Sequence, residues 1–440
     1  MSSILTNNGA MIALQTLKGI NGAMAKTQSQ ISTGKDVANA KDNAAVWSIS
    51  KVMESDVEGF KNISDSLALG QSTVAVARQA SETVTDLLKQ MKGKIVSAQG
   101  ENVDRGKLQT DVAALRDQIV ATVGAAQFNG LNLLSNKSTV AGSGSTNVLS
   151  SLDRSATGVA TSSISALKQD LTQSASAIAA TGGTFNANVN TSAVTLNGTQ
   201  TGSINVGTAV SGASLNFNAG TAFALNVFGT DGDNSSFTQA SWRTSAAAAS
   251  TQTEAAANSI RYVTREGDTA ATVAKALGEA YGRWAGANGL STDTLNITAN
   301  NGALSITSKV TTASDTLQVN LVSVSNTATN TIGGGLEGLR TVDVSSASGA
   351  KSGLNAIEGL IQTAVDASAS FGSVQGRIET QSKFISGLSD SLKAGIGTLV
   401  DADMEETSAR LQALQTQQQL GVQALSIANQ APQSILSLFR

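Results

Sequence analysis

A heptad repeat over residues 46–98 constrains the fold of this chain more than any other feature. Apolar or small residues occupy almost every position of a 3-and-4 alternation that begins at Val46, which places them along one seam of a long helix. No proline interrupts the stretch, and at about 1.5 Å per residue the helix spans ~80 Å. Because a one-sided apolar seam needs a facing partner, the sequence predicts a second long helix elsewhere in the chain.

The partner is predicted near the other end of the chain. Counting in sevens from Ile357 again gives a regular apolar series, which continues to Leu399. Two heptad helices so far apart in sequence predict a chain that folds back to pair its own ends. We expect a coiled-coil-like helical bundle formed by residues 46–135 with 351–399. Its predicted core contains Met53, Phe60, Ile63, Leu67, Val74, Val84, Leu88, Ile95, Phe371, Ile378, Ile385 and Leu392.

Both ends of the chain carry thinner apolar patterns, within residues 1–45 and 400–440. Isolated helices of this strength are marginal in water, so each is expected to gain order from a partner. Pro432 either ends the last helix or begins a final helical turn. We predict paired terminal helices with a partner surface made of Ile4, Leu5, Ile12, Leu14, Leu17, Ile20, Leu411, Leu414, Leu425, Ile435, Leu438 and Phe439.

Residues 136–350 have a different composition, dominated by Ser, Thr, Asn, Gly and Ala. Alternating runs on either side of Asn-Gly pairs predict β-hairpins at residues 197–198 and 300–302. Between them lies a stretch with helical periodicity, capped by Asp268 or Thr269. The predicted fold class is therefore mainly α at both ends, with an inserted β-rich α+β domain. Because loop-closure entropy changes slowly with length, we expect a short linker to replace residues 140–348 without loss of the helical bundle.

Composition excludes several classes of function. The chain has no Cys and no His, so it lacks thiol nucleophiles, the commonest general base and the commonest zinc ligand. A net charge of -3 and 3% aromatic residues argue against nucleic-acid binding. No stretch approaches about 18 consecutive apolar residues, so no membrane insertion is expected. No catalytic residue, cofactor or metal site is predicted, and residues 231–234 are interpreted as a turn rather than a calcium loop.

Three motifs resemble bacterial flagellin and occur in the order found in that family. They are residues 31–50 (ISTGKDVANAKDNAAVWSIS), 128–134 (FNGLNLL) and 429–440 (NQAPQSILSLFR). The resemblance implies a structural subunit without catalysis. In that family the paired terminal helices self-assemble into the flagellar filament used for swimming, and the middle domain projects outward as a surface-exposed, variable domain.

The resemblance also implies partners and a location. The expected partners are other copies of the chain, hook-associated and cap proteins, and a flagellar export chaperone. The expected location is the extracellular filament, reached through the flagellar type III pathway without a cleaved signal peptide. Residues 1–25 fit this route, because they lack the basic region and compact apolar run of a secretory signal.

Two alternatives stay open at the level of sequence. A hook–filament junction protein resembles flagellin at both ends, although the final motif and the large insert favour flagellin. A carbohydrate-active enzyme carried by the insert is the second alternative. Turnover that depends on a carboxylate of the insert would distinguish it from a structural subunit.

Overall fold

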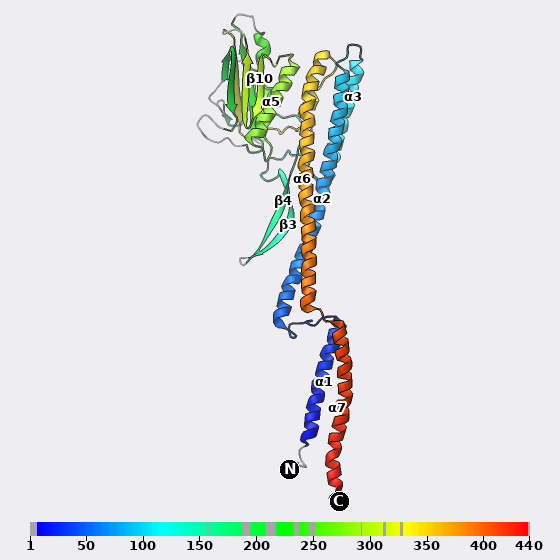
Figure 1. The fold of residues 1–440 in the computed structure, drawn as a ribbon. Helices are drawn as coiled ribbons and strands as arrows, with labels where there is room; N and C mark the ends of the chain where they lie inside the picture. The colour runs from blue at the N-terminus through cyan, green and yellow to red at the C-terminus, as the bar shows by residue number, and fades with distance from the viewer. Residues whose placement is uncertain are drawn as a thin grey trace. The chain divides into compact units, whose positions relative to one another are not determined.

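The computed structural model describes residues 7–155, 158–186, 194–207, 217–232, 237–245, 251–291, 293–310, 314–325 and 329–438 (Figure 1). Long helices form both ends of the chain and antiparallel sheets form its middle, which confirms the predicted fold class. The chain divides into two compact units. One consists of Met1–Asp65, Ser151–Thr161 and Gln381–Arg440, and the other of Ser66–Ser150 and Ser162–Thr380.

The terminal helices of the first unit are α1 (Asn8–Thr33) and α7 (Met404–Leu438), which lie side by side (Figure 1). Asn7 caps the start of α1, and Gly34, with a φ of 70°, ends it in the left-handed conformation that glycine favours. Of the two alternatives predicted for Pro432, the helix does not end there: α7 continues through this residue to Leu438. A proline cannot donate to the carbonyl four residues earlier, and in this structure Asn7 Nδ2 donates to that carbonyl, Ala428 O, at 2.8 Å.

Three helices form the helical part of the second unit: α3 (Arg105–Ala125) and the adjoining parts of α2 (Ala44–Ser97) and α6 (Ala347–Val400). The small residues from Ala347 onward extend α6 further toward the N-terminus than the heptad series indicated. Polar side chains join α2 to α6 at its exposed margins. Arg78 Nε donates to Gln375 Oε1 at 2.9 Å, and Lys92 Nζ lies 2.5 Å from Glu358 Oε1.

A long two-stranded ribbon, β3 (Ser145–Ser155) with β4 (Gly158–Leu167), follows the short hairpin of β1 (Gln127–Phe128) and β2 (Leu131–Asn132). Asn129 and Gly130, at φ 50° and 78°, form the turn of the short hairpin. Strand β3 lies so close to α2 that a Cβ atom on Gly70 would be 2.5 Å from Val148 Cγ2. Gly70, a small residue in the heptad series, therefore lies where β3 contacts α2.

Substituting Ala for Gly70 is expected to lower the free energy of unfolding by about 1–3 kcal/mol, because the added methyl group overpacks the contact with Val148. Gly93 lies in the same helix with no atom within 4 Å of an added Cβ. Gly93→Ala is the matched control and should stabilise the chain by up to about 1 kcal/mol through helix propensity. Chemical denaturation followed by circular dichroism measures both, and equal stabilisation by the two substitutions would contradict the contact.

In the described residues, the β-rich part of the second unit contains two sheets. One has the order β10 (Leu295–Asn300), β11 (Ala303–Lys309), β7 (Thr199–Asn205). The other has the order β5 (Phe185–Asn186), β12 (Thr316–Val324), β8 (Ala222–Thr230), β9 (Arg261–Val263), with β6 (Val194–Asn197) also paired to β12. The remaining short elements are α4 (Gln252–Ala257), η1 (Gln239–Trp242) and η2 (Glu337–Thr341).

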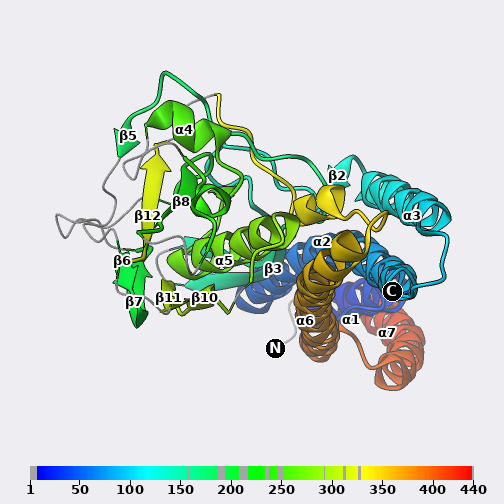
Figure 2. The ribbon, with the colours of Figure 1, turned by 90° about the horizontal axis from the view of Figure 1, so that it is seen from above.

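Helix α5 (Ala270–Ala287) lies beside β8, β10 and β11 (Figure 2). Its N-cap is Thr269, one of the two residues predicted. Strand β8 is buried on both faces. Phe223, Leu225 and Val227 join the core that also contains residues of α5, whereas Ala222 and Ala224 join a smaller core that contains Ala255 of α4.

The hairpin predicted at residues 300–302 is confirmed: β10 and β11 pair antiparallel, and Asn301 and Gly302 both have positive φ, as a type I′ turn requires. The hairpin predicted at residues 197–198 is wrong. Strands β6 and β7 form there but belong to different sheets, so Gly198 turns the chain from one sheet into the other. A side chain on Gly202 of β7 would collide with Val194 of β6, which shows how closely the two strands pack at this corner.

Candidate functional site

Hydrogen bonds hold α1 and α7 together, both at the end of the pair next to the connectors, called the junction below, and further along the two helices. At the junction the backbone N–H of Asp36 donates to Val400 O at 2.7 Å, and that of Ala402 donates to Gly34 O at 3.0 Å. Further along, Gln418 Nε2 donates to Asn21 Oδ1 at 2.8 Å. Only two short connectors, residues 34–43 and 401–403, separate this pair from α2 and α6.

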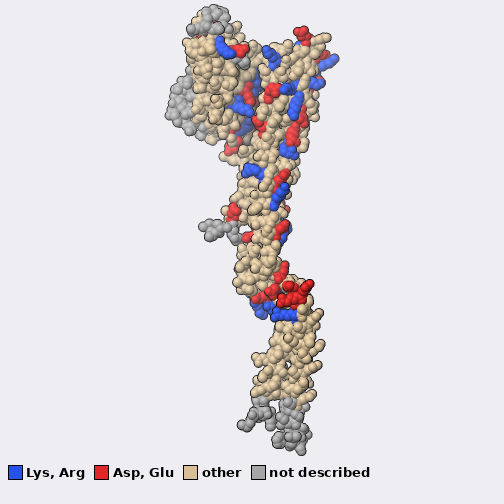
Figure 3. Space-filling model, viewed as in Figure 1, with Lys and Arg blue, Asp and Glu red and all other residues tan. Residues whose placement is uncertain are grey.

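Large apolar side chains remain exposed on both helices of the pair. Ile12 is 65% exposed and Ile427 is 69% exposed, and Met11, Leu14, Leu420 and Val422 are also exposed. Charges are sparse there: α1 carries only Lys18 and Lys26, and α7 has none between Gln412 and Leu438. The face seen in Figure 3 shows the same paucity of Lys, Arg, Asp and Glu over these helices. An exposed apolar surface of this kind is typical of a protein interaction site.

The structure describes the side chains of only some residues of the predicted partner surface. Leu414 is buried, at 8% exposure, and Leu17, Ile20, Leu411 and Leu425 are half-buried. Ile12 and Leu14 face solvent in this single chain. Ile4, Leu5 and Phe439 lie outside the described residues, and of Ile435 and Leu438 only the helical backbone is described.

The predicted bundle residues lie mostly in the interior. Met53 and Leu392 are half-buried. The other ten are buried: Phe60, Ile63, Leu67, Val74, Val84, Leu88, Ile95, Phe371, Ile378 and Ile385. The long helices therefore supply a stable support, and their heptad positions are used within the chain.

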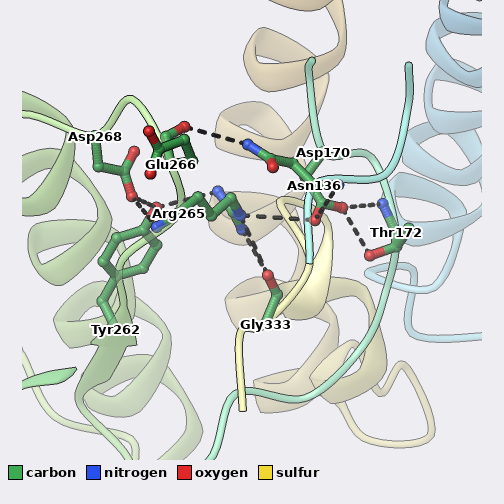
Figure 4. A network of polar contacts seen from close by, with 8 residues as sticks. All are labelled: Asn136, Asp170, Thr172, Tyr262, Arg265, Glu266, Asp268 and Gly333. Atoms are coloured by element: carbon green, nitrogen blue, oxygen red, sulfur yellow. Dashed lines mark hydrogen bonds and ion pairs between the residues drawn. The ribbon is translucent and has the colours of Figure 1, made fainter. Parts of the chain in front are cut away.

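A second feature, which sequence reasoning missed, is a buried polar cluster around Arg265 and Asp170 (Figure 4). The Asp170 side chain is 0% exposed, and its Oδ2 lies 3.7 Å from Arg265 Nε. Asp170 also accepts from Thr172 N at 2.8 Å, from Thr172 Oγ1 at 2.7 Å and from Asn136 N at 3.2 Å. Arg265 Nη2 donates to Gly333 O at 2.8 Å.

Tyr262 and Asp268 complete the cluster. Burial raises the pKa of the Tyr262 hydroxyl well above its ordinary value, with Arg265 opposing and Asp268 reinforcing the shift. The protonated hydroxyl donates to Asp268 Oδ2 at 2.7 Å and accepts from Arg265 Nη1 at 3.1 Å. Nearly every polar atom of the cluster has a hydrogen-bond or ion-pair partner within the chain. The cluster is therefore structural, and it acts as a clamp that joins β9, the connector at residue 170 and the segment before η2.

The glycines at residues 333–335 belong to this clamp. A side chain on Gly334 would collide with the backbone of Thr172, and one on Gly335 with that of Asp170. The Gly-rich run is thus explained by close backbone approach rather than by a ligand. It was the one sequence signal that could have located the cluster.

The residues that the structure describes bear on two kinds of site, metal-binding clusters and membrane-spanning helices. Within them, no group of three or more acidic side chains is arranged to hold a metal ion. None of the helices in the described ranges combines the length and apolar character needed to cross a membrane.

Comparison with known proteins identifies the family. Residues 4–139 match the bacterial flagellin N-terminal helical region, and residues 354–439 match the bacterial flagellin C-terminal helical region. Flagellin A of Rhizobium meliloti is 34% identical over 443 residues, and flagellin B of the same organism is 32% identical over 450 residues. Each comparison covers 100% of both chains.

A solved structure of FliC from Burkholderia pseudomallei aligns with 70% of this chain and 99% of its own, at 16% identity and a TM-score of 0.30. The assignment therefore rests on the sequence relatives and on the two helical regions at the ends. On that evidence the chain belongs to the bacterial flagellin family.

Proposed function

We propose that this flagellin, a structural subunit of the bacterial flagellar filament, assembles through its paired terminal helices α1 and α7. The observation that carries the proposal is the exposed apolar surface of these helices, represented by Ile12 and Ile427, on a pair with few charges. Burying such side chains against another copy stabilises association by about 1.5–3 kcal/mol each. The buried heptad core of α2 and α6 leaves this surface as the part that other subunits complete.

We also propose a role for each part of the chain. Residues 1–45 with 400–440 form the filament core, residues 46–135 with 351–399 form the bundle around it, and residues 136–350 form the surface-exposed insert. We propose hook-associated and cap proteins and an export chaperone as further partners. Export follows the flagellar type III pathway without a cleaved signal peptide. Neither nucleic acid nor a membrane takes part, and the chain works without catalysis or cofactor.

Seeded elongation tests the proposed function. Purified subunit is added to short filament fragments, and growth is followed by sedimentation and electron microscopy. We expect the chain to elongate seeds into long filaments by itself. A hook–filament junction protein would add at most a terminal layer, so failure to elongate would favour that alternative.

An isolated backbone bridge offers a position at which removal of the insert can be tested. Ala177 and Thr331 face each other in an isolated antiparallel bridge, with N···O distances of 3.0 and 2.8 Å. Replacing residues 178–330 by an Asn-Gly turn closes the chain at this bridge. We expect the shortened chain to keep its helical circular dichroism and to elongate seeds.

A wider deletion, of residues 140–348, is the comparison. It also removes β3 and β4, and therefore exposes the seam of α2 around Gly70 that Val148 covers. We expect this variant to be less stable than the shorter deletion in thermal unfolding. Equal stability of the two variants would show that β3 and β4 do not support the bundle.

A further inference from the structure

Pro432 lies inside α7, six residues before the last residue of the helix. In an α-helix the N–H of each residue donates to the carbonyl four residues earlier, and proline has no N–H. The helix nevertheless extends six residues beyond Pro432 in the chain, to Leu438. The carbonyl of Ala428 therefore cannot receive its ordinary intrahelical hydrogen bond.

Asn7 supplies the donor that is missing. Its Nδ2 donates to Ala428 O at 2.8 Å, although the two residues are 421 positions apart. Its Oδ1 accepts from Ala10 N at 3.1 Å and so caps the first turn of α1. An Asn amide carries a donor and an acceptor at once, whereas an aspartate accepts only. One side chain thus joins the start of α1 to the single carbonyl of α7 that proline leaves without its usual partner.

The surrounding geometry makes this contact specific for one register of the two helices. A Cβ atom on Gly9 would lie 3.9 Å from Ala428 Cβ, so the helices are in close contact at this level. At the opposite end of the pair, the backbone hydrogen bond from Ala402 N to Gly34 O fixes the junction. A shift of α7 by one residue would take Ala428 O away from Asn7 and place in its stead a carbonyl that already has a helical donor.

We infer that Asn7 and Pro432 together form a register latch, in which the proline creates an acceptor that only the correctly aligned α1 satisfies. The inference rests on the proposed function, because the aligned pair presents the apolar surface that other copies cover. Asn7 is a positioning residue: it acts by holding Ile12 and Ile427 in one arrangement.

A double-mutant cycle tests the latch through rescue. Asn7→Asp keeps an oxygen for the helix cap and removes the donor to Ala428 O. We expect it to raise the critical concentration for seeded elongation about tenfold, as loss of a partly buried hydrogen bond would. Pro432→Ala restores the helical N–H at position 432. In that background, Asn7→Asp should change the critical concentration by less than about twofold.

A designed disulfide reports the register directly. The natural chain has no cysteine, and the 3.9 Å separation lies within the Cβ···Cβ range of a disulfide. The variant Gly9→Cys/Ala428→Cys should form an intrachain cross-link on oxidation of the free monomer and of filaments, seen as a faster-migrating single chain in gel electrophoresis without reductant. Asn7→Asp should lower the cross-linked fraction at least about threefold, and Pro432→Ala should restore it.

The outcomes separate the latch from the proposed function. If the unsubstituted chain elongates seeds and Asn7→Asp is equally harmful with Pro432 and with Ala at that position, the latch is refuted and the proposed function stands. An unchanged cross-linked fraction in Asn7→Asp refutes the latch in the same way. If the unsubstituted chain itself fails to elongate seeds, the proposed function fails, whereas the cross-link in the monomer still reports the latch.

Discussion

Substituting Asp for Ile12 or for Ile427 is expected to abolish seeded elongation while leaving the monomer folded. Both side chains are more than half exposed in the single chain, so a carboxylate there costs the monomer little. In a filament interface the same substitution loses about 1.5–3 kcal/mol of apolar burial and adds several kcal/mol for an unpaired buried charge. The critical concentration should therefore rise more than about a hundredfold.

The control for this experiment is Ile12→Val, which keeps an apolar side chain and should elongate seeds within about threefold of the natural chain. Thermal unfolding by circular dichroism should give the same midpoint for all monomers. Sedimentation of the Asp variants as filaments would show that the exposed surface of α1 and α7 is not the assembly interface.

Replacing Asp170 by Ala is expected to lower the free energy of unfolding by about 3–5 kcal/mol, the usual cost of removing one partner of a buried ion pair. Arg265 would keep its bond to Gly333 O and lose its carboxylate, and the backbone N–H groups of Asn136 and Thr172 would lose their acceptor. Denaturation followed by tryptophan fluorescence detects this, because Trp242 and Trp284 lie in the same unit.

The matched control is Asp366→Ala in the same unit. Asp366 pairs with Lys275 at 3.5 Å, but both side chains are about half exposed, at 53% and 52%. An exposed pair contributes less than about 1 kcal/mol. Equal effects of the two substitutions would show that burial of the Asp170–Arg265 pair adds nothing to stability.

The long helices could be predicted because their signal is repeated many times. Heptad spacing located α2 to within two residues at its start, and no single position in the series had to be interpreted correctly. The hairpin at Asn301 and Gly302 was predictable for a different reason: a type I′ turn requires positive φ at two successive residues, and few pairs besides Asn-Gly adopt it.

The contacts that hold these elements together could not be predicted, because each depends on one residue and on a distant partner. Nothing near Asn7 in the sequence indicates Ala428, and nothing near Asp170 indicates Arg265. The turn at Gly198 could likewise be predicted only in part, even though β6 and β7 are neighbours in the sequence. Local chemistry predicted the turn correctly, but the choice of partner strand was decided by β12 and β11, more than 100 residues later.

The nesting of the helices has a consequence for the order of folding. Contacts between α1 and α7 join residues up to 421 positions apart, and closing so long a loop first would be slow and entropically costly. Once α2 and α6 have paired, the remaining loops are only the connectors at residues 34–43 and 401–403. The terminal pair should therefore form last and open first, so that its opening and closing can take place while the rest of the chain stays folded.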